Sequence, residues 1–237
     1  MNRFYKIILK NLIWVPFILP RMRLMAKHPE RYTEEQRYAL AMKVVQLVAD
    51  SGSIQVRSHG MEHIPSEGGC LICPNHQDKF DPLAIWLTHK SPVSVVIDDA
   101  ACHRPVICDF VPMVDGIKLL KNDLKGMYRA TEEVRRKLQQ DKRYILFPEG
   151  QYEEEYHTLR PFMTGCFRSA MKANKPILPV AIVDSFRAFA YNEPAPVLVD
   201  VHYLPPILPA DYAGLNTSDV SEMVRTRIQE ALDRFQN

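Results

Sequence analysis

The feature that most constrains the fold is an alternation between short apolar runs rich in β-branched residues and longer segments with helical periodicity. Short apolar runs are typical of buried strands, and apolar residues at intervals of three and four indicate amphipathic helices. The alternation predicts an α/β fold with a mostly parallel, mixed central sheet of about seven strands flanked by helices. The predicted strands lie at 54–57, 70–73, 93–97, 116–120, 143–147, 176–183 and 197–204.

Helix signals separate these runs. Thr33-Glu34-Glu35-Gln36 has the spacing of a capping box and opens a helix that ends near Ser51-Gly52-Ser53. Asp219 and Glu222 are spaced like a cap pair at the start of the last helix, which we expect over 219–235. The other predicted helices lie at 83–88, 123–139 and 164–173.

The first 27 residues contain basic side chains and no acid. The uncharged stretch within them, 11–20, is ten residues long and contains two prolines, whereas a helix needs about 20 residues to span a bilayer. We therefore predict a helical, interfacial membrane anchor over 1–50, followed by one α/β domain over 51–237. A cleaved signal peptide is the alternative. We expect Trp14, Phe17, Ile18 and Leu19 to lie among acyl chains, and Arg3, Lys6, Lys10, Arg21 and Arg23 to meet anionic headgroups.

Charge and cysteine content narrow the possible partners. A formal net charge of +2 does not indicate a nucleic-acid-binding protein. Five cysteines form an odd set, which favours a reducing compartment. A zinc site formed by Cys70, Cys73, Cys102 and Cys108 is an alternative, but a buried Cys-Leu-Ile-Cys strand is the simpler interpretation because free Cys packs as a small hydrophobe. We expect neither a metal nor a cofactor.

The segment 73–82 (CPNHQDKFDP) contains the side chains with the clearest chemical use. His76 and Asp81 are five positions apart, and on a continuous helix they would point about 140° away from each other. Pro82 disfavours helical backbone at Asp81, so we predict a turn in which Asp81 caps the following helix and also contacts His76. Asp78 is the alternative partner for His76.

Such a pair suits base catalysis. The carboxylate would fix the imidazole tautomer, leaving the other ring nitrogen to take a proton from a hydroxyl. No Gly-x-Ser-x-Gly motif and no nearby Ser or Cys nucleophile is evident, so the hydroxyl would belong to the substrate and would attack a thioester directly. Backbone N–H groups of the turn and of the helix start could stabilise the oxyanion.

Three segments occur in a recognisable order: Asn75-His76-x-x-x-x-Asp81-Pro82, then Phe147-Pro148-Glu149-Gly150, then Ile177-Leu178-Pro179-Val180. Together, from about residue 54 to 183, they resemble the glycerophospholipid acyltransferases, and most closely those that acylate 1-acylglycerol-3-phosphate in bacteria. The resemblance implies a base–carboxylate pair at His76 and Asp81. It also implies substrate binding around Asn75, Glu149 and Gly150, an acyl-CoA or acyl-carrier-protein donor as co-substrate, and N-terminal helices that enter one membrane leaflet.

Two departures from the family pattern concern the acceptor. Lys121 stands where the family usually has an arginine, and Gln151 follows Glu149-Gly150 where Thr-Arg is usual. Arginine binds phosphate through two parallel hydrogen bonds, whereas lysine is a point charge. Lys118 or Arg160 could assist Lys121. The acidic run at 153–155 is typical of a solvated loop.

We therefore predict an acyltransferase that converts a lysophospholipid, preferably 1-acylglycerol-3-phosphate, to phosphatidic acid as a peripheral protein at the cytoplasmic face of the cell membrane. The alternatives are an acceptor without phosphate, a thioesterase that uses the same base, and a membrane-binding homologue without activity.

Overall fold

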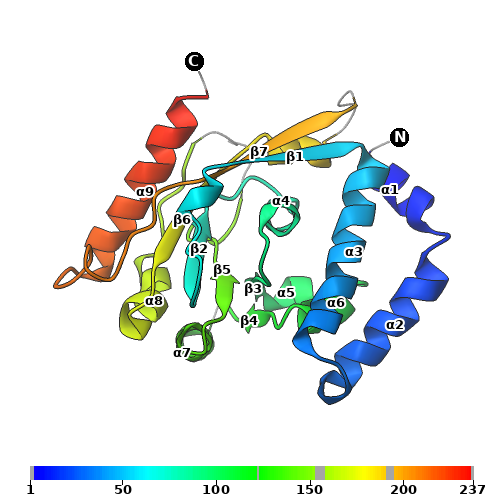
Figure 1. The fold of residues 1–237 in the computed structure, drawn as a ribbon, viewed down its shortest axis with the longest axis horizontal. Helices are drawn as coiled ribbons and strands as arrows, with labels where there is room; N and C mark the ends of the chain where they lie inside the picture. Colours follow the sequence, from blue (N-terminus) through cyan, green and yellow to red (C-terminus); the bar gives the residue numbers. More distant parts are fainter. Residues whose placement is uncertain (1–2, 122, 153–157, 191–194, 236–237) are drawn as a thin grey trace.

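The computed structural model describes residues 3–121, 123–152, 158–190 and 195–235 (Figure 1). Seven strands of this described part form one sheet in the order β1-β7-β6-β2-β5-β3-β4. All of them lie at the predicted positions and differ from the prediction only at their ends. The strands are β1 (Ile54–His59), β2 (Cys70–Pro74), β3 (Ser94–Asp98), β4 (Ile117–Leu119), β5 (Arg143–Ile145), β6 (Ile177–Val183) and β7 (Val197–Tyr203).

The sheet is mixed, as predicted. β6 and β7 pair antiparallel, and every other neighbouring pair of these strands is parallel. Consequently β1 and β7 run opposite to the other five strands, whose carboxyl ends share one edge. The loops that follow β2 and β5, two neighbours in the sheet, therefore emerge side by side at that edge.

Helices cover both faces of the sheet (Figure 1). Successive side chains of β2 point to opposite faces of the sheet: Cys70 and Ile72 pack into one apolar core, and Leu71 and Cys73 pack into the other. A strand buried on both faces needs helices on both sides. The helices are α1 (Arg3–Asn11), α2 (Val15–Lys27), α3 (Glu34–Gly52), α4 (Asp81–Thr88), α5 (Asp99–Cys102), α6 (Ile107–Met113), α7 (Leu124–Gln139), α8 (Arg168–Ala173) and α9 (Thr217–Asp233), with 3₁₀ turns at Pro29–Arg31, Met61–His63, Thr164–Phe167 and Ser185–Ala188.

Of the two predicted helix caps, the one at the start of α3 is confirmed and the one at the start of α9 is wrong. Thr33 and Gln36 form the expected capping box at the start of α3. At the start of α9 the N-cap is Asn216 rather than Asp219, and Asp219 is the capping-box partner of Asn216. Asn216 accepts hydrogen bonds from the backbone of Ser218 and Asp219, so the helix begins two residues earlier than predicted.

The N-terminal segment forms two helices that pack against the rest of the chain. Ile7 of α1 and Met22 and Met25 of α2 are buried in the core. Phe17 is 72% exposed and Trp14 46% exposed, whereas Ile18 and Leu19 are half-buried. None of the described helices combines the length and the apolar character required to cross a bilayer.

Three of the basic residues that we expect to meet headgroups contact protein instead, and one of them is Arg23, whose Nε donates to Asp109 Oδ2 at 3.0 Å. Arg3 is buried, and its guanidinium donates to the Gly52 carbonyl at 2.5 Å. Lys10 Nζ donates to the Ser51 carbonyl at 3.0 Å. Cations are favourable at a helix C-terminus, where carbonyls lack intrahelical partners. The prediction that Arg3 meets a headgroup therefore differs from the structure, whereas Lys6 is exposed.

Candidate active site

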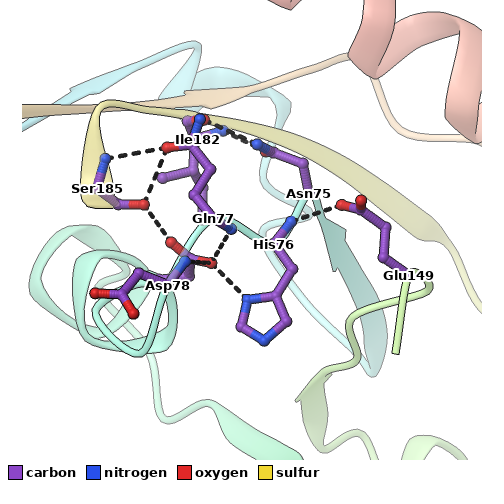
Figure 2. Close-up of polar contacts among 8 residues, drawn as sticks. Asn75, His76, Gln77, Asp78, Glu149, Ile182 and Ser185 are labelled. Carbon is purple, nitrogen blue, oxygen red and sulfur yellow. Dashed lines mark hydrogen bonds and ion pairs between the residues drawn. The ribbon is translucent and has the colours of Figure 1, made fainter. Parts of the chain in front are cut away.

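The turn between β2 and α4 brings His76 onto Asp81 (Figure 2). His76 Nδ1 lies 2.6 Å from Asp81 Oδ2. The same oxygen accepts hydrogen bonds from the backbone N–H groups of Gln77 at 2.6 Å and Asp78 at 3.0 Å. An ionised carboxylate only accepts, so Nδ1 carries the proton of the His76–Asp81 hydrogen bond. The predicted pairing of the two side chains is present, and Asp78 is not the hydrogen-bond partner of His76.

Asp81 does not cap α4, contrary to the prediction. It is the first residue of the helix, and no cap bond is formed at Phe80, the N-cap. Because its carboxylate points back over the preceding turn, it satisfies the N–H groups of Gln77 and Asp78 rather than those of the helix. Those two N–H groups are therefore not free to stabilise an oxyanion.

Ser185 contacts the other oxygen of Asp81 and the Gln77 side chain holds Ser185, and the sequence pattern identified neither residue. The fully buried Ser185 hydroxyl donates to Asp81 Oδ1. Gln77 Oε1 accepts from Ser185 N at 3.1 Å. Ser185 lies 104 residues from Asp81 in the chain, and its surrounding sequence carries no motif. Its burial behind the carboxylate makes it a positioning residue rather than a nucleophile.

Asn75 fixes the turn to β6. Its side-chain amide donates to the Ile182 carbonyl at 3.0 Å and accepts from Ile182 N at 2.7 Å (Figure 2). Asn75 is 2% exposed. The side chain thus extends the strand pairing of β2 with β6, which differs from the predicted substrate contact.

Glu149, in the loop after β5, supports the same turn from the opposite side. Its Oε1 accepts from His76 N at 2.7 Å, and its Oε2 accepts from Arg160 N at 2.9 Å. Burial raises the pKa of Glu149, and the two backbone N–H groups partly oppose that shift. Glu149 therefore fixes the backbone of the proposed base and of a candidate cation.

Gly150 is required by the backbone geometry. Its φ is +74°, and a Cβ at this position would lie 2.6 Å from the Met163 Cε atom. A left-handed conformation is costly for residues with a side chain. The tight turn at Gly150 is therefore part of how Glu149 reaches His76.

Aromatic rings surround the His76 imidazole. The Phe147 ring stacks on it with centroids 4.1 Å apart, and the Tyr152 ring meets it at 71° with centroids 4.8 Å apart. The His76 side chain is only 15% exposed. Among the described residues Nε2 has no hydrogen-bond partner, and Figure 2 shows it on the side of the His76 ring away from the dashed hydrogen bond. The arrangement leaves one proton-accepting nitrogen on a ring that two aromatic side chains contact.

The candidate phosphate-binding cations have different surroundings. Lys121 Nζ forms an ion pair with Asp98 Oδ2 at 2.8 Å, which lowers the pKa of Asp98. Lys118 is exposed on β4. When the Gln151 side-chain amide is oriented with its oxygen toward Arg160, that oxygen accepts hydrogen bonds from the two terminal guanidinium nitrogens, Nη1 at 3.1 Å and Nη2 at 3.2 Å. Arg160 is thus joined to the His76 turn through Glu149. The acidic run at 153–155 lies outside the described residues.

The alternative four-cysteine zinc site is not assembled. Cys70 and Cys73 point to opposite faces of the sheet, into different cores. Cys102 is buried, whereas Cys108 is exposed. A Cys-x-x-Cys pair on an extended strand cannot place both sulfur atoms on one ion, because side chains alternate between faces.

The turn, the Glu149 loop and β6 all lie within residues 55–183, which match the family model named Acyltransferase. This span is more than half of the chain. The chain belongs to the acyltransferase family. The predictions of the family and of an O-acyltransferase are therefore confirmed.

Relatives with curated names agree with this assignment. The acyltransferase is 25% identical over 185 residues to the 1-acyl-sn-glycerol-3-phosphate acyltransferase of Borreliella burgdorferi, covering 76% of this chain and 72% of that protein. It is 23% identical over 168 residues to the protein of the same name from Escherichia coli, covering 70% and 68% of the two chains.

A solved structure shares the fold. The crystal structure of the 1-acyl-sn-glycerophosphate (LPA) acyltransferase PlsC from Thermotoga maritima aligns with a TM-score of 0.76 at 20% identity, covering 99% of this chain and 93% of that one. The likeness extends over the N-terminal helices as well as the sheet. It confirms the α/β architecture, whereas membrane anchoring by residues 1–50 stays a prediction.

Proposed function

We propose that this acyltransferase moves a fatty acyl group from acyl-CoA or acyl-carrier protein to the free hydroxyl of 1-acylglycerol-3-phosphate, giving phosphatidic acid. The observation that carries the proposal is the hydrogen bond of 2.6 Å between His76 Nδ1 and a fully buried Asp81. It leaves Nε2 as a proton acceptor. The names of the bacterial relatives support the choice of acceptor.

The geometry supports a direct transfer. His76 Nε2 takes the proton of the acceptor hydroxyl as its oxygen attacks the thioester carbonyl. The tetrahedral intermediate then expels the thiolate, which receives the proton from the imidazolium. Asp81 stabilises the imidazolium between these steps. Ser185, the serine nearest to the pair in space, is buried behind Asp81, so an acyl-enzyme is not part of the mechanism.

The acceptor's phosphate would be bound by cations at the same sheet edge. Arg160 is a candidate because Glu149 fixes its backbone next to the His76 turn. Lys121 and Lys118 belong to β4 and the residues that follow it, two strands from β5. A guanidinium can bind two phosphate oxygens at once, which compensates for the missing Thr-Arg after Gly150.

One observation favours a second candidate acceptor. The Lys121 ammonium is already paired with Asp98 at 2.8 Å, so its charge is partly neutralised before any phosphate arrives. A lysolipid or alcohol without a phosphomonoester would not need this cation. The reaction and the base would be the same, and only the acceptor would differ.

The membrane role also belongs to the proposal. Phe17 is exposed on α2 and Trp14 is exposed in the turn before it, and Lys6 and Arg21 of the two N-terminal helices supply positive charge. Exposed aromatic side chains beside basic ones suit an anionic lipid surface. We infer peripheral binding to the cytoplasmic face of the membrane, where a thioester donor is available.

The decisive experiment combines the donors with a panel of acceptors. The protein is incubated with acyl-CoA or acyl-carrier protein and with lysophosphatidic acid, zwitterionic lysolipids and glycolipid alcohols, and the products are identified by lipid mass spectrometry. We expect phosphatidic acid as the main product and none with His76→Ala. A main product without a phosphomonoester would support the second acceptor, and thioester hydrolysis unaffected by any lysolipid would refute acyl transfer.

A further inference from the structure

A cluster of two histidines and a carboxylate lies where β1 pairs with β7, outside the proposed active site. The parallel register places His59 beside His202 and Arg57 beside Asp200. His202 also pairs with Ala181 of β6, so β6 lies between this cluster and β2, the strand that leads into the turn with His76. Figure 1 shows β1 and β7 together at one side of the sheet.

The three side chains lie close together. Side chains two residues apart on a strand share a face, which puts Asp200 and His202 together, and the register adds His59. His59 Nε2 lies 2.8 Å from Asp200 Oδ1, and the two imidazole rings are stacked at 8° with centroids 4.3 Å apart. One ligand atom from each residue lies within 4.8 Å of the other two.

His202 has an unmet hydrogen-bonding group. Its Nε2 is buried and has no hydrogen-bond partner within the described part of the chain. The Phe235 ring covers the imidazole, with centroids 4.2 Å apart. An imidazole nitrogen without a hydrogen-bond partner is a group that can bind a metal ion.

We propose that His59, Asp200 and His202 bind a divalent transition-metal ion of the Zn²⁺ type, cross-linking the edge strand β1 to β7. Two imidazoles and one carboxylate are ligands that Zn²⁺ accepts, with water in the remaining position. Ligand atoms on one tetrahedral ion lie about 3.4 Å apart. A rotation of the exposed His59 ring closes the difference, and coordination through Nε2 requires the tautomer that carries its proton on Nδ1.

Arg57 sets the strength of this site. The Arg57 Nε donates to Asp200 Oδ1 at 2.8 Å, and the Arg57 Nη2 donates to Asp200 Oδ2 at 2.6 Å. The pair orients the carboxylate, as hydrogen-bond partners of metal ligands commonly do. Its positive charge opposes a cation, so we expect micromolar rather than nanomolar affinity.

The test uses tag-free, full-length protein and the metals themselves. Zn²⁺ binding is measured by isothermal titration calorimetry and by the rise in melting temperature, and Co²⁺ binding by its visible spectrum, which distinguishes imidazole and oxygen ligands from the exposed Cys108 thiolate. His59→Gln and Asp200→Asn remove one ligand each. His103→Gln is the matched control, because His103 pairs with Asp99 at 3.2 Å without a second imidazole.

We expect wild type and His103→Gln to bind one ion with equal affinity and to melt at a higher temperature with Zn²⁺. His59→Gln and Asp200→Asn should bind at least about tenfold more weakly and lose the rise in melting temperature. His59→Gln changes an exposed side chain, so its melting temperature without metal should equal that of wild type. Equal affinity in wild type and His59→Gln, a thiolate-type Co²⁺ spectrum, or no binding by folded wild type at millimolar metal would each overturn the proposal.

Discussion

Replacement of Asp81 by Asn separates the charge of this carboxylate from its shape. Oδ2 of Asp81 accepts three N–H groups, from His76, Gln77 and Asp78. An asparagine oxygen in that position can accept the same three, while its NH₂ group faces Ser185, whose hydroxyl can rotate to accept. The turn should therefore form, and the free energy of unfolding should fall by only about 1–2 kcal/mol.

The catalytic cost is larger because the imidazolium loses its counter-charge. Two unit charges about 4 Å apart attract each other by about 4 kcal/mol at an effective dielectric constant of about 20. Asp81 is fully buried, so water does not replace this interaction. A loss of about 3–4 kcal/mol in the transition state corresponds to a fall in kcat of about 10²–10³-fold, with little change in KM.

Release of free thiol from acyl-CoA in the presence of lysophosphatidic acid measures this loss directly. Asp78→Asn is the matched control, because this half-buried carboxyl neighbours His76 without a hydrogen bond to its ring, and burial raises its pKa. Its kcat should stay within about threefold of wild type. The reasoning fails if folded Asp81→Asn keeps kcat within about tenfold of wild type, or if Asp78→Asn is the variant that loses activity.

Four further changes test other parts of the structure. Ser185→Ala removes the hydroxyl that donates to Asp81, so kcat should fall about tenfold in steady-state kinetics with KM unchanged. Gly150→Ala imposes a side chain at φ +74° and should lower the free energy of unfolding in urea by about 2–3 kcal/mol. His89 has a folded pKa of about 4 against 6.5 for an unperturbed histidine, through burial. The unfolded chain therefore binds more protons between these values, wild-type stability should rise with pH across that window, and His89→Asn should flatten the rise in urea unfolding. Lys121→Ala should raise KM about threefold or more for lysophosphatidic acid, and an unchanged KM would assign the phosphate to another cation.

The positions of the strands could be predicted because they depend on local sequence. Runs such as 177–183 are apolar and β-branched, which fixes them as buried strands wherever they pair. The pairing of β1 with β7 could not be predicted, since it joins segments about 140 residues apart. The wrong prediction for Arg3 has the same cause. The local charge pattern indicated a lipid headgroup, whereas the partner of Arg3 is the Gly52 carbonyl at the end of α3, which is distant in the sequence.

The sequence by itself predicted that His76 and Asp81 meet in a turn, and the hydrogen bond between them is present. The reason given for that turn is wrong, because Asp81 before Pro82 is the first residue of α4 rather than a non-helical residue. Tertiary structure alone decided what holds that pair in place. Ser185 reaches Asp81 from the 3₁₀ turn that follows β6, and Glu149 reaches the backbone of His76 from the loop after β5. Local sequence controls which conformations a short segment can adopt, whereas contacts between strands depend on how the whole sheet assembles around its two cores.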